Sequence, residues 1–184
     1  GEMMKDDNDI VIVTADMGTP AFDNIRTRFP KRFINVGIAE QNCISVAAGL
    51  AREGKKPYIF NIATFAILRG LEQIKVGVSI MDLPVTIVGT GTGFSYDDAG
   101  PTHHLFEDIA IVRSMPHIKI NSVSDNVMAK KIAESSRHMK KANYVRLERH
   151  INPNIYGEET DFSKGYQIVK PGKKVCVISN GFML

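Results

Sequence analysis

Short apolar runs alternate with longer segments of helical periodicity along most of this chain, and this alternation is the feature that most constrains its fold. The run IVIVTA at 10–15 is continuously apolar, as in a strand buried on both faces. Strand and helix signals that alternate at these lengths favour an α/β fold: a doubly wound, mostly parallel sheet with helices on both faces. We expect strands at 10–15, 32–36, 58–62, 85–88, 118–121 and 143–147, and helices at 19–29, 40–53, 65–79, 106–114 and 125–139.

The texture of the sequence changes after residue 150. Prolines and glycines punctuate a polar segment at 151–172, which indicates a linker. The run VCVIS within 173–184 predicts a strand. Because a lone buried strand is not stable, we expect a domain at 1–150, a linker, and the first strand of a truncated C-terminal domain. The chain is then a fragment, or a following domain is missing.

Composition excludes some classes of partner. The 184 residues carry a net charge of +3, from 23 basic and 20 acidic side chains, which gives no indication of nucleic acid. No signal peptide or apolar run of about 18 residues is found, so no membrane partner is expected. Cys43 and Cys176 lie in apolar segments and are expected to be small buried residues. A reducing, cytoplasmic location is the default expectation.

Several candidate residues come directly after predicted strands: Glu40, Phe65, the glycine-rich loop 89–104 and Arg149. In parallel sheets of this kind, ligands gather at the carboxyl ends of the strands. We therefore expect these residues to share one edge of the sheet.

The same loop raises a nucleotide-binding alternative, because Gly89, Gly91 and Gly93 follow a strand. A dinucleotide fingerprint needs glycines in a GxGxxG frame that opens a helix. Phe94 or Tyr96 takes the third glycine place, and no helix is predicted directly after it. We set this alternative aside.

Glu40 has two interpretations. Ile44, Ala47 and Ala51 form an apolar stripe, and counting back four residues from Ile44 reaches Glu40, on the face built to be buried. A buried carboxylate is unfavourable unless it is paired, which makes Glu40 a functional candidate. With Gly37 as N-cap, Glu40 would instead be the third helical residue, where a carboxylate binds backbone N–H groups. Spacing alone favours the capping interpretation and leaves the functional one open.

Three segments, in order, carry a family resemblance. They are Gly37-Ile-Ala-Glu-Gln-Asn42 followed by Ala47-Ala-Gly-Leu50; Thr64-Phe65 with Arg69 and Glu72-Gln-Ile74; and Gly100-Pro-Thr-His-His104 with Glu107-Asp-Ile-Ala110 and Arg113-Ser-Met-Pro116. The ordered set resembles the pyrimidine-binding domain of the transketolase family, which uses thiamine diphosphate. The loop with adjacent histidines is most similar to transketolases encoded as two half-chains, so the chain resembles the C-terminal subunit of a split transketolase.

The resemblance implies roles for individual residues. Glu40 matches the glutamate that hydrogen-bonds N1′ of the cofactor's aminopyrimidine, whose 4′-nitrogen then removes a proton from the thiazolium. Phe65 matches the aromatic that packs on the pyrimidine, although a core position fits its pattern equally well. His103 matches a histidine facing the substrate oxygen, and Arg149 an arginine that binds the substrate phosphate. Their structural alternatives are a helix-entry histidine and a solvated arginine. Asp16 matches an acid near the cofactor at a subunit interface.

The resemblance also bears on substrate and partner. Ala99 and Gly91 stand where the family usually has an acid and a histidine, which argues against standard pentose-phosphate donors. The Gly-Asp-Gly…Asn segment of the family's diphosphate- and Mg²⁺-binding domain is not found in this sequence. A partner subunit or domain is therefore implied to bind Mg²⁺ and the diphosphate, in a homodimer or heterotetramer. The implied reaction transfers a two-carbon ketol unit between sugar phosphates. A deoxyxylulose-phosphate-synthase-like decarboxylating enzyme and a non-catalytic interaction module are the alternatives.

Overall fold

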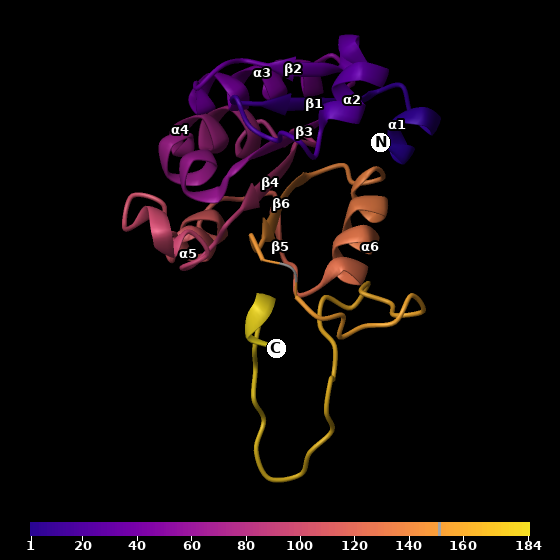
Figure 1. The fold of residues 1–184 in the computed structure, drawn as a ribbon, viewed down its shortest axis with the longest axis vertical. Coiled ribbons are helices and arrows are strands. Elements are labelled where there is room, and N and C mark those ends of the chain that lie inside the picture. The colour runs from indigo at the N-terminus through magenta and orange to yellow at the C-terminus, as the bar shows by residue number, and fades with distance from the viewer. Residues whose placement is uncertain (151) are drawn as a thin grey trace.

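A computed structural model describes residues 1–150 and 152–184. Its centre is a six-stranded sheet in the order β2-β1-β3-β4-β6-β5, in which every neighbouring pair is parallel (Figure 1). The strands are β1 (Ile10–Thr14), β2 (Phe33–Asn35), β3 (Lys56–Ile62), β4 (Thr86–Thr90), β5 (Ile118–Ser122) and β6 (Ala142–Leu147). Each of the six strands predicted within residues 1–150 is present, and the α/β prediction is confirmed.

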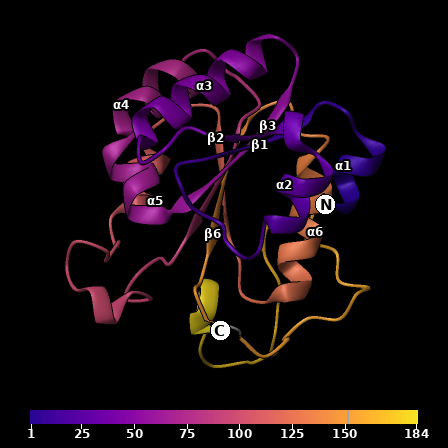
Figure 2. The ribbon, with the colours of Figure 1, turned by 45° about the horizontal axis from the view of Figure 1, so that its top comes forward.

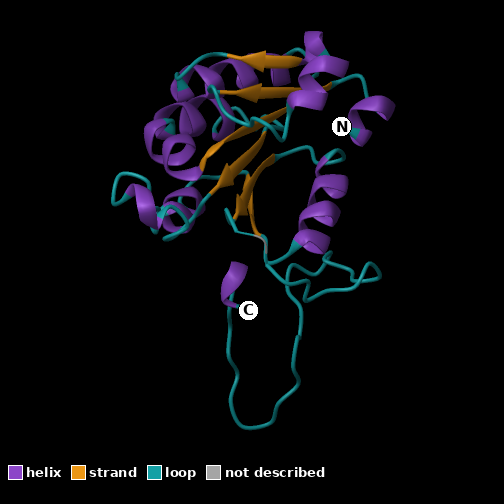
Figure 3. Cartoon of the chain, viewed as in Figure 1, coloured by secondary structure: helices purple, strands orange, loops and turns teal. Residues whose placement is uncertain are grey.

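Helices cover both faces of the sheet (Figures 2 and 3). The first face is covered by α3 (Glu40–Arg52), η2 (Phe65–Arg69), α4 (Leu71–Gln73), η3 (Ile74–Ser79) and α5 (Asp108–Arg113). The second face is covered by α1 (Glu2–Asp6), α2 (Asp23–Arg28) and α6 (Asn126–Ser136). Along β1 the side chains alternate, so that Val11 and Val13 enter the first core while Ile10 and Ile12 enter the second. The continuous apolar run is thus explained by burial on both faces.

Helix α3 is held by the predicted apolar stripe. Cys43, Ile44, Ala47 and Ala51 are buried against the sheet, mainly over β1 and β3. Tertiary packing of this face provides most of the stability, because a helix of 13 residues is marginal alone. The first residue of α3, Glu40, is thereby fixed at the carboxyl edge of the sheet.

The segment at 65–79 is helical, as predicted, but it is not one continuous α-helix. Two π-helical stretches, η2 and η3, flank the short α4. Gly70 joins η2 to α4, and a Cβ there would lie 2.7 Å from the Ala66 carbonyl oxygen and 3.1 Å from Ile44 of α3. Only glycine permits this close approach. π-Helical turns occur frequently at functional sites.

The helix ends also differ from the predictions, since α2, α5 and α6 are shorter than expected and α1 is not anticipated by the sequence pattern. At the start of α6 the cause is a cap: the carboxylate of Asp125 accepts a hydrogen bond from the backbone N–H of Met128 across 2.8 Å. The helix proper therefore begins after Asp125. None of the helices in the described part of the chain is long and apolar enough to cross a bilayer.

The C-terminal tail, residues 152–184, contains one helical turn, η5 (Gly181–Met183), and no strand. Val177 and Ile178 are 84% and 92% exposed, because no neighbouring strand pairs with this run. Cys43 is buried as expected, whereas Cys176 is exposed, so the predicted burial of Cys176 is wrong.

The tail leaves the sheet after β6 and its tip returns to the β5 edge (Figure 1). There the Ser122 hydroxyl donates to the side-chain carbonyl of Asn180 across 3.1 Å. The assignment of 151–172 as a linker and of 173–184 as the start of another domain stays a prediction, as does the boundary of the 1–150 domain. Residue 151, where the predicted linker begins, lies outside the described residues.

Candidate active site

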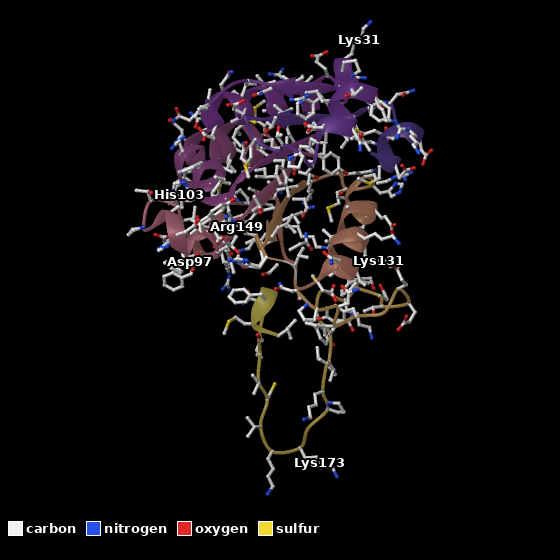
Figure 4. The ribbon with its side chains drawn as sticks, in the orientation of Figure 1. Lys31, Asp97, His103, Lys131, Arg149 and Lys173 are labelled. Carbon is white, nitrogen blue, oxygen red and sulfur yellow. The ribbon has the colours of Figure 1, made fainter. Side chains whose placement is uncertain are left out.

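The carboxyl ends of the parallel strands carry the candidate site. Glu40 opens α3 after β2, Phe65 opens η2 after β3, and Arg149 follows β6. His103 lies in the loop between β4 and α5, on the same side of the fold as Arg149 (Figure 4). Side-chain contacts link these residues into one continuous cluster, as the argument from the sheet edge predicts.

Glu40 is a buried acid, with a relative exposure of 5%. The N-cap of α3 is Ala39, Glu40 is the first helical residue, and no side chain caps the helix, so the capping interpretation with Gly37 is wrong. The Glu40 carboxylate is instead paired with Arg69, whose Nη1 donates to Oε2 across 2.6 Å. Burial raises the pKa of the Cys43 thiol to about 11. The hydrogen bond from Asn61 opposes this shift, and the negative charge of Glu40 adds to it. Cys43 is thus no nucleophile at neutral pH.

Arg69 also contacts Phe65. Its Cζ lies 4.4 Å from the centre of the Phe65 ring, a cation–π distance. Phe65 is half-buried and belongs to none of the described apolar clusters, in contrast to its neighbours Ala66 and Ile67. The core alternative for Phe65 is therefore not supported. Sequence reasoning missed the pairing of Arg69 with Glu40, since the position of Arg69 four residues after Phe65 indicates only a contact with that ring.

His103 extends the cluster beyond Phe65, toward the side of the site where the family resemblance predicts the sugar substrate. Its ring meets the Phe65 ring edge-on, with centroids 5.0 Å apart and an interplanar angle of 69°. Nδ1 of His103 shares a hydrogen bond of 3.0 Å with the Thr102 hydroxyl. This contact engages one ring nitrogen and leaves Nε2 as the second possible donor or acceptor.

Arg149 ends the cluster and has two partners. Its Nη1 donates to Asp98 Oδ1 across 2.9 Å, and its Cζ lies 4.8 Å from the centre of the Tyr96 ring. The Tyr96 ring is in turn 5.8 Å from the His103 ring. Tyr96 therefore joins His103 to Arg149, a role that the sequence pattern did not reveal.

Glu148 anchors the loop that carries Tyr96 and His103. The Thr92 hydroxyl donates to Glu148 Oε1 across 3.0 Å, and the Ser95 hydroxyl contacts Oε2. Thr92 and Ser95 are buried, so these bonds are shielded from water. The carboxylate fixes the first half of the loop next to Arg149.

Asp16 lies apart from this cluster. Its Oδ1 accepts a hydrogen bond of 3.1 Å from the Asn35 amide, and its backbone N–H donates to Asn35 Oδ1 across 2.9 Å. Both residues line a small cavity of about 50 Å³ between β1, β2 and α2. The structure brings Glu40, Phe65 and His103 into contact through shared neighbours, but not Asp16.

The second histidine of the pair points elsewhere. The His104 ring contacts Phe94 and Phe106, with centroid distances of 5.0 and 6.1 Å, rather than the neighbours of His103. Within residues 1–150 and 152–184, no group of three or more His, Cys, Asp or Glu side chains is arranged to hold a metal ion.

Sequence comparisons relate the chain to a known family. The family model described as the transketolase pyrimidine-binding domain matches residues 1–153. The chain is 35% identical over 162 residues to one of the subunits of the apulose-4-phosphate transketolase of Phocaeicola vulgatus, covering 88% of this chain and 52% of that protein. It is 34% identical over 195 residues to the 1-deoxy-D-xylulose-5-phosphate synthase of Clostridium botulinum strain Alaska E43, covering 100% of this chain and 30% of that enzyme.

A solved structure shares the fold. A split-gene transketolase, described as an inactive β4 tetramer, superposes with a TM-score of 0.82 at 30% identity and covers 94% of this chain and 56% of that chain. The chain thus spans about half the length of these two transketolase relatives. Together with the ordered cluster at the sheet edge, these matches show that the chain belongs to the transketolase family, with residues 1–153 matching its pyrimidine-binding domain.

Proposed function

We propose that this chain is the pyrimidine-binding part of a thiamine diphosphate-dependent enzyme that transfers a two-carbon ketol unit between sugar phosphates. The observation that carries the proposal is the buried Glu40 carboxylate at the ligand-binding edge of the sheet, which does not cap its helix. Arg69 links this carboxylate to the half-buried Phe65 ring. Membership of the transketolase family implies thiamine diphosphate as the cofactor.

Glu40 and Phe65 fit an aminopyrimidine ring. Glu40 would hold a ring nitrogen by sharing a proton through a carboxyl oxygen, and Phe65 would offer an aromatic surface to the planar heterocycle. Burial of Glu40 excludes water and strengthens such a hydrogen bond. When bound, thiamine diphosphate supplies the nucleophilic carbon that accepts and passes on the two-carbon unit.

His103 and Arg149 serve the substrate in this proposal. His103 exchanges a proton with the substrate oxygen through Nε2, since Thr102 engages Nδ1. Arg149 binds the phosphate, because a guanidinium forms paired hydrogen bonds with phosphate oxygens. Its present partner Asp98 is 68% exposed at the side chain, so the ion pair is weak and a phosphate can replace it.

The second half of the active site comes from a partner. The apulose-4-phosphate transketolase relative is one subunit of a multi-subunit enzyme, which supports a separate diphosphate-binding subunit that also holds Mg²⁺. Asp16, away from the main cluster, is the residue proposed to meet the cofactor across the interface. The assembly is a homodimer or heterotetramer. A cytoplasmic location fits the free, buried thiol of Cys43, which is typical of a reducing compartment.

One reconstitution experiment tests the proposal. The chain is combined with the candidate diphosphate-binding subunit, and thiamine diphosphate binding and ketol transfer from a ketose phosphate are measured. Glu40→Gln is expected to lower the transfer rate by about 10²- to 10⁴-fold, the usual effect of losing a general acid–base group. Glu53→Gln, an exposed acid at the other end of α3, serves as the matched control. Undiminished activity of Glu40→Gln would favour a non-catalytic interaction module, and tight cofactor binding by the lone chain would contradict the split site.

A decarboxylating synthase is the second candidate, supported by the identity with the 1-deoxy-D-xylulose-5-phosphate synthase over the whole chain. The same reconstituted pair distinguishes the two enzymes. Turnover of pyruvate with release of CO₂, without transfer from a ketose phosphate, would replace the transketolase-type proposal.

A further inference from the structure

Tyr96 occupies the space in which any side chain at position 91 would begin. A Cβ built on Gly91 would lie 1.9 Å from Tyr96 Cε2 and 2.4 Å from Cδ2, whereas real Cβ contacts stay above about 3 Å. Gly91 also has a φ of +78°, which favours glycine. The absence of a side chain at position 91 is therefore what admits the phenol ring at this place.

The ring of Tyr96 contacts both of the residues proposed to serve the substrate. The His103 ring is near it, with ring centroids 5.8 Å apart, and so is the Arg149 guanidinium, with Cζ 4.8 Å from the ring centre. A substrate that contacts both His103 and Arg149 therefore comes close to Tyr96.

The position of Tyr96 is set by its anchored neighbours. Ser95, directly before it, contacts the carboxylate of Glu148, and Thr92 donates to the same carboxylate across 3.0 Å. Ser95 and Thr92 are 6% and 3% exposed. A ring held in this way is preorganised, so a contact to it carries little entropic penalty.

The Tyr96 hydroxyl is available to a ligand. Within the described residues no hydrogen bond to this hydroxyl is found, although the ring is half-buried. Burial raises the pKa of Tyr96. The positive charge of Arg149 opposes this shift, and the negative charge of Asp98 adds to it. The phenol is therefore neutral at pH 7 and acts as a hydrogen-bond donor and acceptor rather than as a base.

We propose that Tyr96 is a specificity-determining residue, which binds a hydroxyl group on the carbon chain of the substrate between the ends held by His103 and Arg149. This inference rests on the proposed function. The substrate class it selects is a hydroxylated carbon chain that ends in an anionic group, because a neutral donor–acceptor lies directly beside a cation.

The test compares Tyr96→Phe, which keeps the ring and removes the hydroxyl, with Tyr166→Phe, a matched change in the exposed tail. Fructose 6-phosphate and fructose are used as probes with the reconstituted holoenzyme, by steady-state kinetics and by ligand-observed NMR. In Tyr96→Phe we expect KM and the probe dissociation constant for fructose 6-phosphate to rise by about 2- to 10-fold, the effect of one neutral hydrogen bond, with kcat changed less. Tyr166→Phe should match the wild type.

A second variant tests the place of the ring. Gly91→Ala is expected to expel the Tyr96 ring, and to raise the same KM at least as much as Tyr96→Phe, because the added Cβ needs the space of Cε2. If the wild-type complex transfers the ketol unit while Tyr96→Phe has unchanged KM and probe affinity, this inference is overturned and the proposed function stands. If the wild-type complex neither binds the probe nor transfers the unit, both fall.

Discussion

The guanidinium of Arg69 covers the carboxylate of Glu40. Nη1 of Arg69 donates to Glu40 Oε2 across 2.6 Å, and the same guanidinium lies over Phe65 with Cζ 4.4 Å from the ring centre. Arg69 thus contacts both groups that are proposed to hold the aminopyrimidine. A planar cation with N–H donors resembles that ring in shape and in hydrogen bonding, so the cofactor has to displace Arg69 or bind beside it.

Replacing Arg69 by Met should destabilise the chain without cofactor. The side chain of Glu40 is only 6% exposed, so removal of its partner leaves a buried carboxylate unpaired. We expect a loss of about 1–3 kcal/mol in the free energy of unfolding, measured by urea denaturation at pH 7.

The control for this prediction is Arg52→Met, which changes an exposed arginine in the last turn of α3, the helix that Glu40 opens. It should change the free energy of unfolding by less than about 0.5 kcal/mol. Adding Glu40→Gln to Arg69→Met should recover part of the loss, because the charge that needs pairing is gone. Equal stabilities of wild type and Arg69→Met would show that the pair contributes nothing.

Arg69→Met should also bind the cofactor more tightly than the wild type does. Arg69 is 46% exposed at the side chain, so opening its ion pair costs about 0.2–1 kcal/mol, and losing the stacking on Phe65 about 0.5–1 kcal/mol. Without these costs, the reconstituted pair should bind thiamine diphosphate about 3- to 30-fold more tightly in titration calorimetry. Arg69→Lys keeps the charge but not the planar fork. Its affinity for the cofactor should fall between that of the wild type and that of Arg69→Met. Weaker binding by Arg69→Met would mean that Arg69 itself contacts the cofactor.

The sequence predicts local features of this molecule well. Each strand is signalled by its own apolar run, and the stripe of Ile44, Ala47 and Ala51 correctly identifies Glu40 as an acid on a buried face. The pairing of Glu40 with Arg69 was out of reach because Arg69 lies in a π-helical turn, whose side-chain directions depart from the 3.6-residue period.

Contacts between distant segments explain the other differences. Asp108 was matched as part of a family motif, yet the structure shows a fully buried carboxylate bound by Arg146 Nε across 2.5 Å and by the Tyr144 hydroxyl across 2.8 Å. This ion pair joins α5 to β6 and is structural. A motif match alone does not distinguish such a structural residue from a catalytic one. The motifs also gave no sign that the Tyr96 ring fills the space beside Gly91.

Asp125 should make stability depend on pH below about 4. Burial raises the pKa of this carboxyl, but backbone N–H donors of Met128, Tyr156 and Ile155 lower it to a net value below the usual 3.8. With a depressed folded-state pKa, the stabilisation is present above the unfolded pKa of about 3.9 and is lost as pH falls through the folded value. Asp125→Ala should therefore cost about 1–2 kcal/mol at pH 7, and progressively less between pH 4 and pH 2.

Thermal or urea unfolding of Asp125→Ala at several pH values checks this, with Glu134→Ala, an exposed acid on α6, as the control. The Glu134 variant should follow the wild type at every pH. A stability difference for Asp125→Ala that persists unchanged at pH 2 would show that the ionised carboxylate is not the source of the effect.

Glu148 should control the order of the loop that carries Tyr96 and His103. In Glu148→Ala the Thr92 and Ser95 hydroxyls lose their shared acceptor, a contribution of about 1–3 kcal/mol to the closed loop. Amide hydrogen exchange at 91–105, followed by mass spectrometry, should accelerate by about 5- to 150-fold, while amides of β3 stay unchanged. Glu107→Ala changes a nearby exposed acid whose carboxylate, among the described residues, accepts only from the adjacent backbone N–H of Phe106, and it should leave exchange at 91–105 near the wild-type rate. Slow exchange in both variants would assign the order of the loop to the backbone pairing of Gly93 with Leu105 instead.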